Sequence, residues 1–272
     1  MPVTFDSDSI TPEYLEKFYR GAVNPPWRDQ DEVYFSDPGN MFRFALLAEE
    51  LERIAPSRIL DVGCGGMPLA AFASKKLSAE YVGCDIAQPE RMPADALFAV
   101  ADAAKLSFSD SSFESVVCSE TLEHLYDPAP AIKEIARVLS SDGGALLTVP
   151  NWFSLDSLDG AAGIVSAPLR AAAGVGLAPE FKHGINVHIT RAAPRVWRKL
   201  IEENGLRVES EKPIYLFPYI PYFLNGAKKL ESRFFKNKRT FDFWRSAENS
   251  LARIYPLSRL GQFHFFLCRK KS

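Results

Sequence analysis

Between residues 58 and 149 the chain alternates short apolar runs with stretches of helical periodicity, and this alternation constrains its fold more than any other feature. The runs are apolar throughout rather than at every second residue, which is typical of parallel strands buried on both faces of a sheet. The predicted strands are Arg58–Val62, Tyr81–Asp85, Ala96–Val100, Phe113–Ser119 and Ala145–Val149. Strands that alternate with helices predict an α/β fold with a doubly wound, mostly parallel sheet.

Further elements are predicted in and around this region. Helical periodicity predicts helices over Thr11–Arg20, Met41–Ile54, Pro68–Leu77, Ala129–Leu139 and Thr190–Asn204. Two more apolar runs, Leu206–Ser210 and Phe263–Arg269, bring the predicted sheet to seven strands. We expect Asp142-Gly-Gly144 to separate a helix from the fifth strand, since glycine breaks helices. The stretch from Asp85 to Ala96 is too short for a full crossover helix.

Composition and charge exclude several classes of protein. The 272 residues carry a net charge of −2, which names no partner. No stretch approaches the roughly 18 apolar residues of a membrane span. The cysteines are scattered and form no C-x-x-C pair, so neither a zinc site nor a disulfide framework is indicated. The start of the sequence is acidic and lacks the apolar core of a signal peptide. We therefore expect a cytoplasmic protein.

The residues that follow the first three predicted strands suit a nucleoside. Asp61-x-Gly63-x-Gly65 leaves the first strand, and glycine there permits a close approach of the backbone to a ligand. Asp85 ends the second strand and can accept hydrogen bonds from both ribose hydroxyls, while Asp102 follows the third and can accept from an adenine amino group. In a doubly wound sheet these positions share the edge where ligands bind. Pro68 departs from the dinucleotide fingerprint, which disfavours a nicotinamide-dependent oxidoreductase.

Five motifs follow one another in order along residues 59–144. They are Ile59-Leu-Asp-Val-Gly-Cys-Gly-Gly66, Val82-Gly-Cys-Asp-Ile86, Ala101-Asp-Ala-Ala-Lys-Leu-Ser-Phe108, Phe113-Glu-Ser-Val-Val-Cys-Ser-Glu-Thr-Leu-Glu-His-Leu125 and Glu134-Ile-Ala-Arg-Val-Leu-Ser-Ser-Asp-Gly-Gly144. As an ordered set they resemble the class I S-adenosylmethionine-dependent methyltransferases, in their ubiquinone/menaquinone-biosynthesis-like branch. The resemblance covers residues 40–150 well and 185–210 weakly. It implies a Rossmann-like methyltransferase fold and S-adenosyl-L-methionine as the cofactor.

The resemblance also implies roles for individual residues. The turn of Asp61, Gly63, Cys64 and Gly65 would hold the methionine part of the cofactor. The ribose would bind Asp85 and Ile86, the adenine would lie between Asp102 and Ala103, and Ser119 would lie near the sulfonium. Two positions depart from the family pattern, since Met67 stands where a third glycine is frequent and Glu114 where Asp is usual. We expect a reshaped pocket rather than a lost one.

The polar segment Ser119-Glu-Thr-Leu-Glu-His-Leu125 holds the candidates for catalysis. If it is helical, Glu120, Glu123 and His124 share one face and could ligate a hard divalent cation. Some members of the family hold a metal in a Glu-x-x-Glu-His pattern. The alternatives are His124 as a general base, which contributes about 10²–10⁴-fold in such enzymes, or a structural or positioning role.

These features predict a methyltransferase that acts on an oxygen atom of a small-molecule acceptor, with lipid-linked and quinone- or phenol-like molecules as candidates. The alternative is a non-catalytic S-adenosylmethionine-binding regulatory or scaffold protein. A nucleic-acid acceptor is not expected, because Ser119-Glu-Thr-Leu stands where base-methylating relatives often carry Asn/Asp-Pro-Pro-Tyr/Phe. The sequence does not indicate an oligomeric state.

We expect a single methyltransferase domain over residues 1–272. Its predicted parts are an N-terminal helical cap (1–56), the cofactor-binding core (57–150), the rest of the core with a lid insert (151–212 and 261–272) and an aromatic and basic cap insertion (213–260). From Asn225 to Ser272 the chain carries 12 Lys or Arg against 3 Asp or Glu. Aromatic and basic side chains together suit peripheral contact with an anionic membrane. The alternative is a helical cap whose aromatic side chains are simply core.

Overall fold

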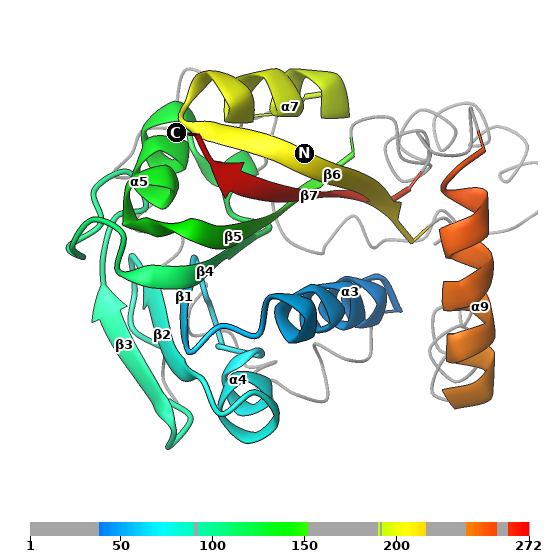
Figure 1. Cartoon of the computed structure of the whole chain (residues 1–272), viewed down its shortest axis with the longest axis horizontal. Coiled ribbons are helices and arrows are strands. Elements are labelled where there is room, and N and C mark those ends of the chain that lie inside the picture. The colour runs from blue at the N-terminus through cyan, green and yellow to red at the C-terminus, as the bar shows by residue number, and fades with distance from the viewer. Residues whose placement is uncertain are drawn as a thin grey trace, which may run out of the picture.

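A seven-stranded sheet forms the centre of the molecule (Figure 1). The computed structural model describes residues 38–89, 92–151, 190, 192–215, 238–254 and 261–271. Its strands are β1 (Arg58–Val62), β2 (Glu80–Asp85), β3 (Ala96–Val100), β4 (Phe113–Ser119), β5 (Leu139–Pro150), β6 (Leu206–Ile214) and β7 (Phe263–Lys270). The order is β3-β2-β1-β4-β5-β7-β6, parallel from β3 to β5, with β7 antiparallel to both β5 and β6. The predicted doubly wound, mostly parallel sheet is confirmed.

Helices cover both faces of this sheet. One face carries α5 (Ala129–Val138) and α7 (Pro194–Glu203), and the other carries α3 (Pro38–Ile54) and α4 (Ala70–Lys76) (Figure 1). Beyond α3 stands α9 (Lys238–Leu251). Between β2 and β3, residues 86–89 and 92–95 contain no helix, as the short spacing predicts.

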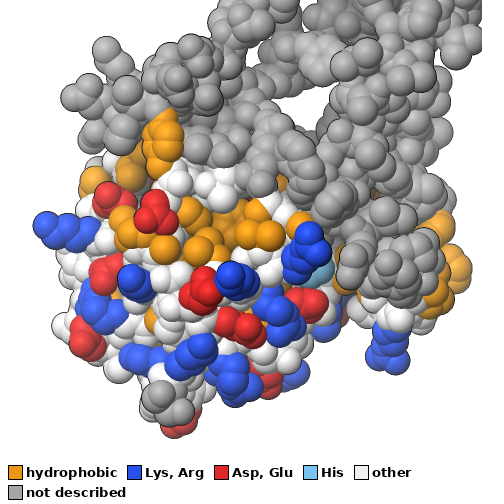
Figure 2. All heavy atoms as spheres, turned by 90° about the horizontal axis from the view of Figure 1, so that it is seen from above, with side chains coloured by type: hydrophobic (Ala, Val, Ile, Leu, Met, Phe, Trp, Pro, Cys, Tyr) orange, Lys and Arg blue, Asp and Glu red, His pale blue; other side chains and the backbone are white. Residues whose placement is uncertain are grey.

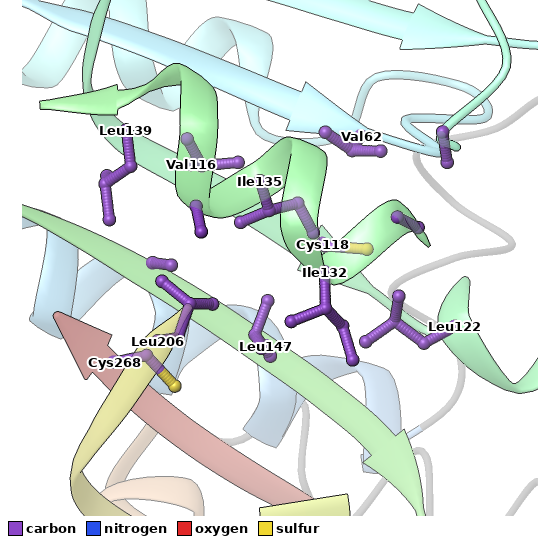
Figure 3. Close-up of a cluster of buried hydrophobic side chains, with 14 of the residues drawn as sticks. Val62, Val116, Cys118, Leu122, Ile132, Ile135, Leu139, Leu147, Leu206 and Cys268 are labelled. Carbon is purple, nitrogen blue, oxygen red and sulfur yellow. The ribbon is translucent and has the colours of Figure 1, made fainter. Parts of the chain in front are cut away.

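The buried strands supply side chains to both faces in turn. On β4, Val116 and Cys118 point toward α5 and join Ile132 and Ile135 in one core cluster (Figure 3). Val117 belongs to the second cluster, under α3 and α4. Side chains of successive strand residues point to opposite faces, so a strand covered on both sides must be apolar throughout. The uninterrupted apolar runs of the sequence therefore reflect a sheet with two cores.

The predicted break before the fifth strand is wrong. β5 begins at Leu139, directly after α5, and continues through Asp142, Gly143 and Gly144. A Cβ atom on Gly143 would lie 2.7 Å from the carbonyl oxygen of Glu114, and one on Gly144 would lie 2.6 Å from Ile54 Cδ1. These glycines allow β5 to pack closely against Glu114 of β4 and Ile54 of α3, and they do not terminate a helix.

The predicted cap insertion is described only in part. β6 extends to Ile214, so the first two residues assigned to the insertion belong to the sheet. Residues 216–237 and 255–260 lie outside the described residues, as do the predicted helix Thr11–Arg20 and most of the lid insert. On α9, the Phe241 ring lies 4.9 Å from that of Phe42, and Arg245 pairs with Glu49 of α3. In the described stretches of the chain, no helix is both long enough and apolar enough to cross a membrane.

The space-filling view shows the described surface as a mixture of basic, acidic and apolar side chains (Figure 2). Lys and Arg side chains lie among Asp and Glu across the visible face, and neither charge forms a continuous patch there. This agrees with the near-neutral overall charge of the sequence.

Candidate cofactor and acceptor site

The predicted cofactor residues come together at the carboxyl edge of the parallel strands. The turn after β1 is tied to the end of β2, because the backbone N–H groups of Gly63 and Cys64 both donate to the carbonyl oxygen of Cys84, at 2.8 and 3.1 Å. The N–H of Gly65 donates to Asp85 Oδ2 at 3.0 Å. The glycine turn after β1 and the carboxylate that ends β2, which the sequence assigns to one site, are thus in direct contact.

The turn needs glycine at two positions for different reasons. Gly63 has φ +72°, and a Cβ atom there would lie 2.2 Å from Thr121 Oγ1. Gly65 has φ +48°, and a Cβ atom there would meet no atom within 4 Å. Gly63 is therefore packed against the protein, whereas Gly65 faces open space beside Asp85. A ligand at this edge can approach the backbone of Gly65 closely.

Met67 stands where the family pattern has a third glycine, and it adopts a backbone conformation that glycine favours. Its φ is +61°, in the left-handed region that glycine favours. The side chain is buried, and a Cβ atom on Gly83 of β2 would lie 2.7 Å from Met67 Cε. The residue thus fills a gap in the core below the turn. Glu114, the other residue that departs from the family pattern, lies at the start of β4, at the opposite edge of the sheet from the site. Its carboxylate accepts a hydrogen bond from the Ser57 hydroxyl.

Asp61 lies inside the protein with one strong partner. The hydroxyl of Tyr81 donates to Asp61 Oδ2 at 2.6 Å, and both side chains are buried. Burial raises the pKa of Asp61 to about 7, which the hydrogen bond from Tyr81 opposes and the charge of Asp85 reinforces. Burial also raises the pKa of Asp85, against the backbone N–H groups of Gly65, Ala87 and Ile86. The thiol of Cys64 is buried with a raised pKa, so this residue serves the site through its backbone.

The loop after β3 places Asp102 and Ala103 at the same edge. Asp102 is exposed, and its Oδ1 accepts a hydrogen bond from Ala104 N at 2.8 Å, while Ala103 is buried. The loop is held from α5: Glu134 accepts from Leu106 N at 2.8 Å, and Arg137 donates to the carbonyl oxygens of Leu106 and Phe108. The position of the predicted adenine-flanking residues thus depends on two charged side chains of a helix.

We expect Arg137→Ala to lower the free energy of unfolding by about 2–3 kcal/mol, since it removes hydrogen bonds from a charged group to two partly buried carbonyls. Hydrogen exchange at Ala104 and Leu106 should quicken in the same variant. Chemical denaturation and exchange mass spectrometry measure the two effects. Arg198→Ala, which removes surface ion pairs to Glu202 and Glu211, is the control and should cost less than about 1 kcal/mol. An equal loss of unfolding free energy in the two variants would show that Arg137 does not hold the loop after β3.

The polar segment after β4 is not the helix that a shared metal-binding face requires. A single 3₁₀ turn spans Leu122–His124, and Glu120 precedes it with φ +55°. Glu120 faces Arg43, whose Nη1 lies 3.5 Å from Oε2, and Thr148, which donates to Oε1 at 3.0 Å. Within the described ranges, no three His, Cys, Asp or Glu side chains form a group that could hold a metal ion.

Glu123 and His124 lie next to each other beyond Glu120. Glu123 is 1% exposed, and neither of its carboxylate oxygens has a hydrogen-bond partner among the described residues. Burial and the charge of Glu120 raise the pKa of Glu123 well above its usual range, which favours the neutral acid. His124 Nε2 lies 3.7 Å from Glu123 Oε1. His124 thus lies in the segment that follows β4, and its role as a general base stays a prediction.

Four residues of the site were not identified from the sequence. They are Arg43, Tyr81, Thr121 and Thr148, each of which contacts a predicted residue. Arg43 stands on the apolar stripe of its helix, and Tyr81 brings a hydroxyl into a buried strand; both patterns could have indicated a buried polar partner. Thr121 and Thr148 leave no comparable signal, because hydroxyls are common at strand ends and in strands.

These residues fit an adenosyl group with a methionine tail. Asp85 ends β2 as an anionic acceptor beside the open face of Gly65, and Asp102 ends the next strand. Ser119 ends β4, two strands from Asp85 along the same edge. A ribose and a base placed along this edge would each find a carboxylate that can accept a hydrogen bond.

Comparison with known proteins agrees with this geometry. Residues 60–147 match the model of a methyltransferase domain. The chain is 32% identical over 118 residues to tocopherol O-methyltransferase, chloroplastic, of Arabidopsis thaliana, across 39% of this chain and 34% of the relative. It is 30% identical over 143 residues to the ubiquinone biosynthesis O-methyltransferase of Alkalilimnicola ehrlichii, across 49% of this chain and 58% of the relative. The matches thus span between one third and three fifths of these relatives' length.

A solved structure shows the fold independently. The crystal structure of the [4+2]-cyclase SpnF has a TM-score of 0.51 with 16% identity, across 82% of this chain and 80% of that one. Because that protein is described as a cyclase, the likeness speaks for the fold and not for the reaction. The motifs, the fold and the domain match agree with one another. Residues 60–147 therefore carry a methyltransferase domain, and over this part the chain is similar to the ubiquinone biosynthesis O-methyltransferases.

Proposed function

We propose that the protein transfers the methyl group of S-adenosyl-L-methionine to a hydroxyl oxygen of a small molecule, with lipid-linked and quinone- or phenol-like compounds as the acceptor class. The observation that carries the proposal is the contact of Gly65 N with Asp85 Oδ2 beside an open face, with Ser119 at the end of β4 on the same edge. The names of the two relatives, both O-methyltransferases, support the choice of oxygen.

The chemistry needs little from the protein beyond placement. The cofactor supplies a methyl group on a positively charged sulfur, which is already a good leaving group. The protein's residues bind the adenosyl group, orient the acceptor and exclude water, and such positioning accounts for roughly 7–11 kcal/mol of a two-reactant barrier. We propose His124, beside the buried Glu123, as the base that takes the hydroxyl proton where the acceptor needs one. Metal ligation by Glu120, Glu123 and His124 forms no part of the proposal.

The test of the proposed function measures both the binding of the cofactor and its turnover. Calorimetry with S-adenosylmethionine and with its demethylated product measures affinity, and formation of that product in the presence of phenol and hydroquinone acceptors measures transfer. We expect binding of both compounds and acceptor-dependent turnover. Binding with no turnover on any acceptor would favour the regulatory or scaffold alternative, and absence of binding by folded protein would rule out both.

The pH dependence of cofactor affinity should follow Asp61. The folded pKa of about 7 lies above the ordinary 3.8, so this group's contribution to stability is complete at low pH and is lost as pH rises from about 4 to about 7. The charged form, which would hold the cofactor's ammonium group, gains population as pH rises through about 7, because that is the folded pKa. We therefore expect affinity to rise through pH 7 and to level off about one unit above it, measured by calorimetry in buffers of matched ionic strength.

Two variants locate the effect. Asp61→Asn should flatten the profile, and Tyr81→Phe should move its midpoint above pH 7, because the hydrogen bond from Tyr81 lowers the pKa of Asp61. Asp95→Asn, at an exposed site before β3, should keep the wild-type profile. A Tyr81→Phe profile identical to the wild type would show that another group controls binding.

The predicted membrane contact through residues 213–260 stays a proposal. The described helix of this segment, α9, places Phe241 and Trp244 against the core under α3, as the helical-cap alternative expects, but leaves Phe243 largely exposed. Flotation with anionic and neutral liposomes at low and high salt tests it. Binding that depends on anionic lipid and falls with salt would support the contact, and no binding to either vesicle would exclude it.

A further inference from the structure

A chain of hydrogen bonds runs from the end of β4 into the protein. Ser119 and Thr148 are partners in the register of β4 and β5, and their hydroxyl oxygens lie 2.9 Å apart. The Thr148 hydroxyl donates to Glu120 Oε1 at 3.0 Å. Thr148 is fully buried, while Ser119 is partly exposed at the carboxyl edge. The chain thus connects an accessible hydroxyl to an internal carboxylate.

Arg43 lies beside the inner end of this hydrogen-bond chain. Burial raises the pKa of Glu120, and the charge of Arg43 and the hydrogen bond from Thr148 both oppose that rise. Arg43 Nη1 lies 3.5 Å from Glu120 Oε2, and the guanidinium lies over the ring of Phe263 at 4.7 Å from the centroid. Glu120 itself has φ +55°, a conformation that costs energy for a residue other than glycine, and its N–H donates to the carbonyl oxygen of Thr148. Strained backbone of this kind is concentrated at functional sites.

The carboxylate fixes the direction of every hydrogen bond in the chain. A threonine hydroxyl has one proton, and that of Thr148 is donated to Glu120. Thr148 can therefore only accept from Ser119, which uses the single proton of Ser119. The Ser119 oxygen can therefore only accept a hydrogen bond from a group outside this hydrogen-bond chain, because its one proton is already used. Among the residues that the structure describes, Ser119 Oγ has no other partner.

We propose that Ser119 Oγ accepts a hydrogen bond from the hydroxyl of the methyl acceptor and thereby selects acceptors that carry an O–H donor. The inference rests on the proposed function and narrows its substrate class. An ether or carbonyl oxygen at the same place has no proton to donate. Its lone pairs would face those of Ser119 Oγ, so binding of such an acceptor is disfavoured. The hydroxyl that donates to Ser119 before the reaction has its lone pairs directed elsewhere, which helps to orient its oxygen for methyl transfer. As that oxygen takes the methyl group, its proton leaves to the proposed base His124, because Ser119 keeps its own proton on the side of Thr148. Ser119 acts as a specificity-determining residue, and Thr148 and Glu120 as positioning residues.

The test compares a hydroxyl probe with its methyl ether. Catechol and 1,2-dimethoxybenzene are titrated by calorimetry into protein saturated with S-adenosylhomocysteine, and the ratio of their affinities is the readout. In Ser119→Ala and Thr148→Val this ratio should fall about 2–10-fold, the size expected for one hydrogen bond. Thr148→Ser keeps the hydroxyl and should keep the ratio. Glu120→Gln should also lower it, because an amide N–H can donate to Thr148 and reverse the chain.

Ser115→Ala is the matched control. Ser115 lies four residues earlier on the same face of β4, is fully buried, and donates to the carbonyl oxygen of Gly144. Its removal should leave the ratio at the wild-type value, with thermal melting used to confirm folding in every variant. An unchanged ratio in both Ser119→Ala and Thr148→Val, or an equal fall in Ser115→Ala, would overturn the inference. Methyl transfer to catechol is measured in the same proteins. If only this inference is wrong, transfer to catechol persists, whereas failure of the proposed function would leave no transfer even in the wild-type protein.

Discussion

Replacing Gly63 with alanine should lower the free energy of unfolding by about 2–5 kcal/mol and abolish cofactor binding. The left-handed conformation costs a residue with a Cβ atom about 1–2 kcal/mol, and overpacking adds about 1–3 kcal/mol. The new Cβ atom would lie 2.2 Å from Thr121 Oγ1 and 2.5 Å from its Cγ2. Because the N–H of Gly63 also binds the end of β2, relief of this clash would pull the turn away from Asp85. Urea denaturation and calorimetry measure the two losses.

Two further variants separate the clash from the backbone strain. Gly65→Ala has a similar φ but open space around the Cβ atom, so it should cost about 1–2 kcal/mol in stability while it still obstructs the cofactor. Thr121→Ala combined with Gly63→Ala removes the two shortest contacts and leaves the Thr121 Cβ contact at 2.9 Å. The double variant should therefore recover part of the stability. Identical stability of the two glycine variants would contradict the role given to Thr121.

Asp85→Ala should weaken binding of S-adenosylmethionine about 100-fold or more with little loss of stability. Two hydrogen bonds from ribose hydroxyls to a charged group are each worth about 1.5–3 kcal/mol, and each 1.4 kcal/mol is about tenfold in affinity. The fold should tolerate the change, because burial raises the pKa of this carboxyl and its removal relieves that cost. Calorimetry gives the affinity and thermal melting the stability.

Asp102→Ala is the natural comparison for Asp85. Asp102 is exposed and is expected to meet the adenine through a single hydrogen bond, so its loss should weaken binding by about tenfold or less. The ranking of the two variants is the decisive result. If Asp102→Ala were the more damaging, the ribose would not lie on Asp85 and the orientation of the cofactor along the edge would need to be reversed.

Local sequence patterns determined the central sheet and the cofactor half of the site. Apolar runs, helical periodicity and the glycine turn are signals carried by a few neighbouring residues, and parallel strands place their carboxyl ends at one edge whatever the details of packing. For this reason the amino-acid sequence alone predicts that Gly63, Gly65 and Asp85 lie together, and their contacts agree with that prediction.

Tertiary structure alone decided the acceptor half of the site and the errors of the sequence prediction. Arg43 meets Glu120 from a helix 77 residues earlier, and Thr148 reaches it across a strand pair. No short-range pattern records such contacts, because they arise only when separate elements pack. The same holds for Asp142-Gly-Gly144, which breaks a helix in isolation but lies within β5 because its neighbours need a backbone without side chains. The sequence therefore specified which residues meet at the carboxyl edge of the sheet, and only the packing of α3, β4 and β5 specified the contacts of Glu120 with Arg43 and Thr148.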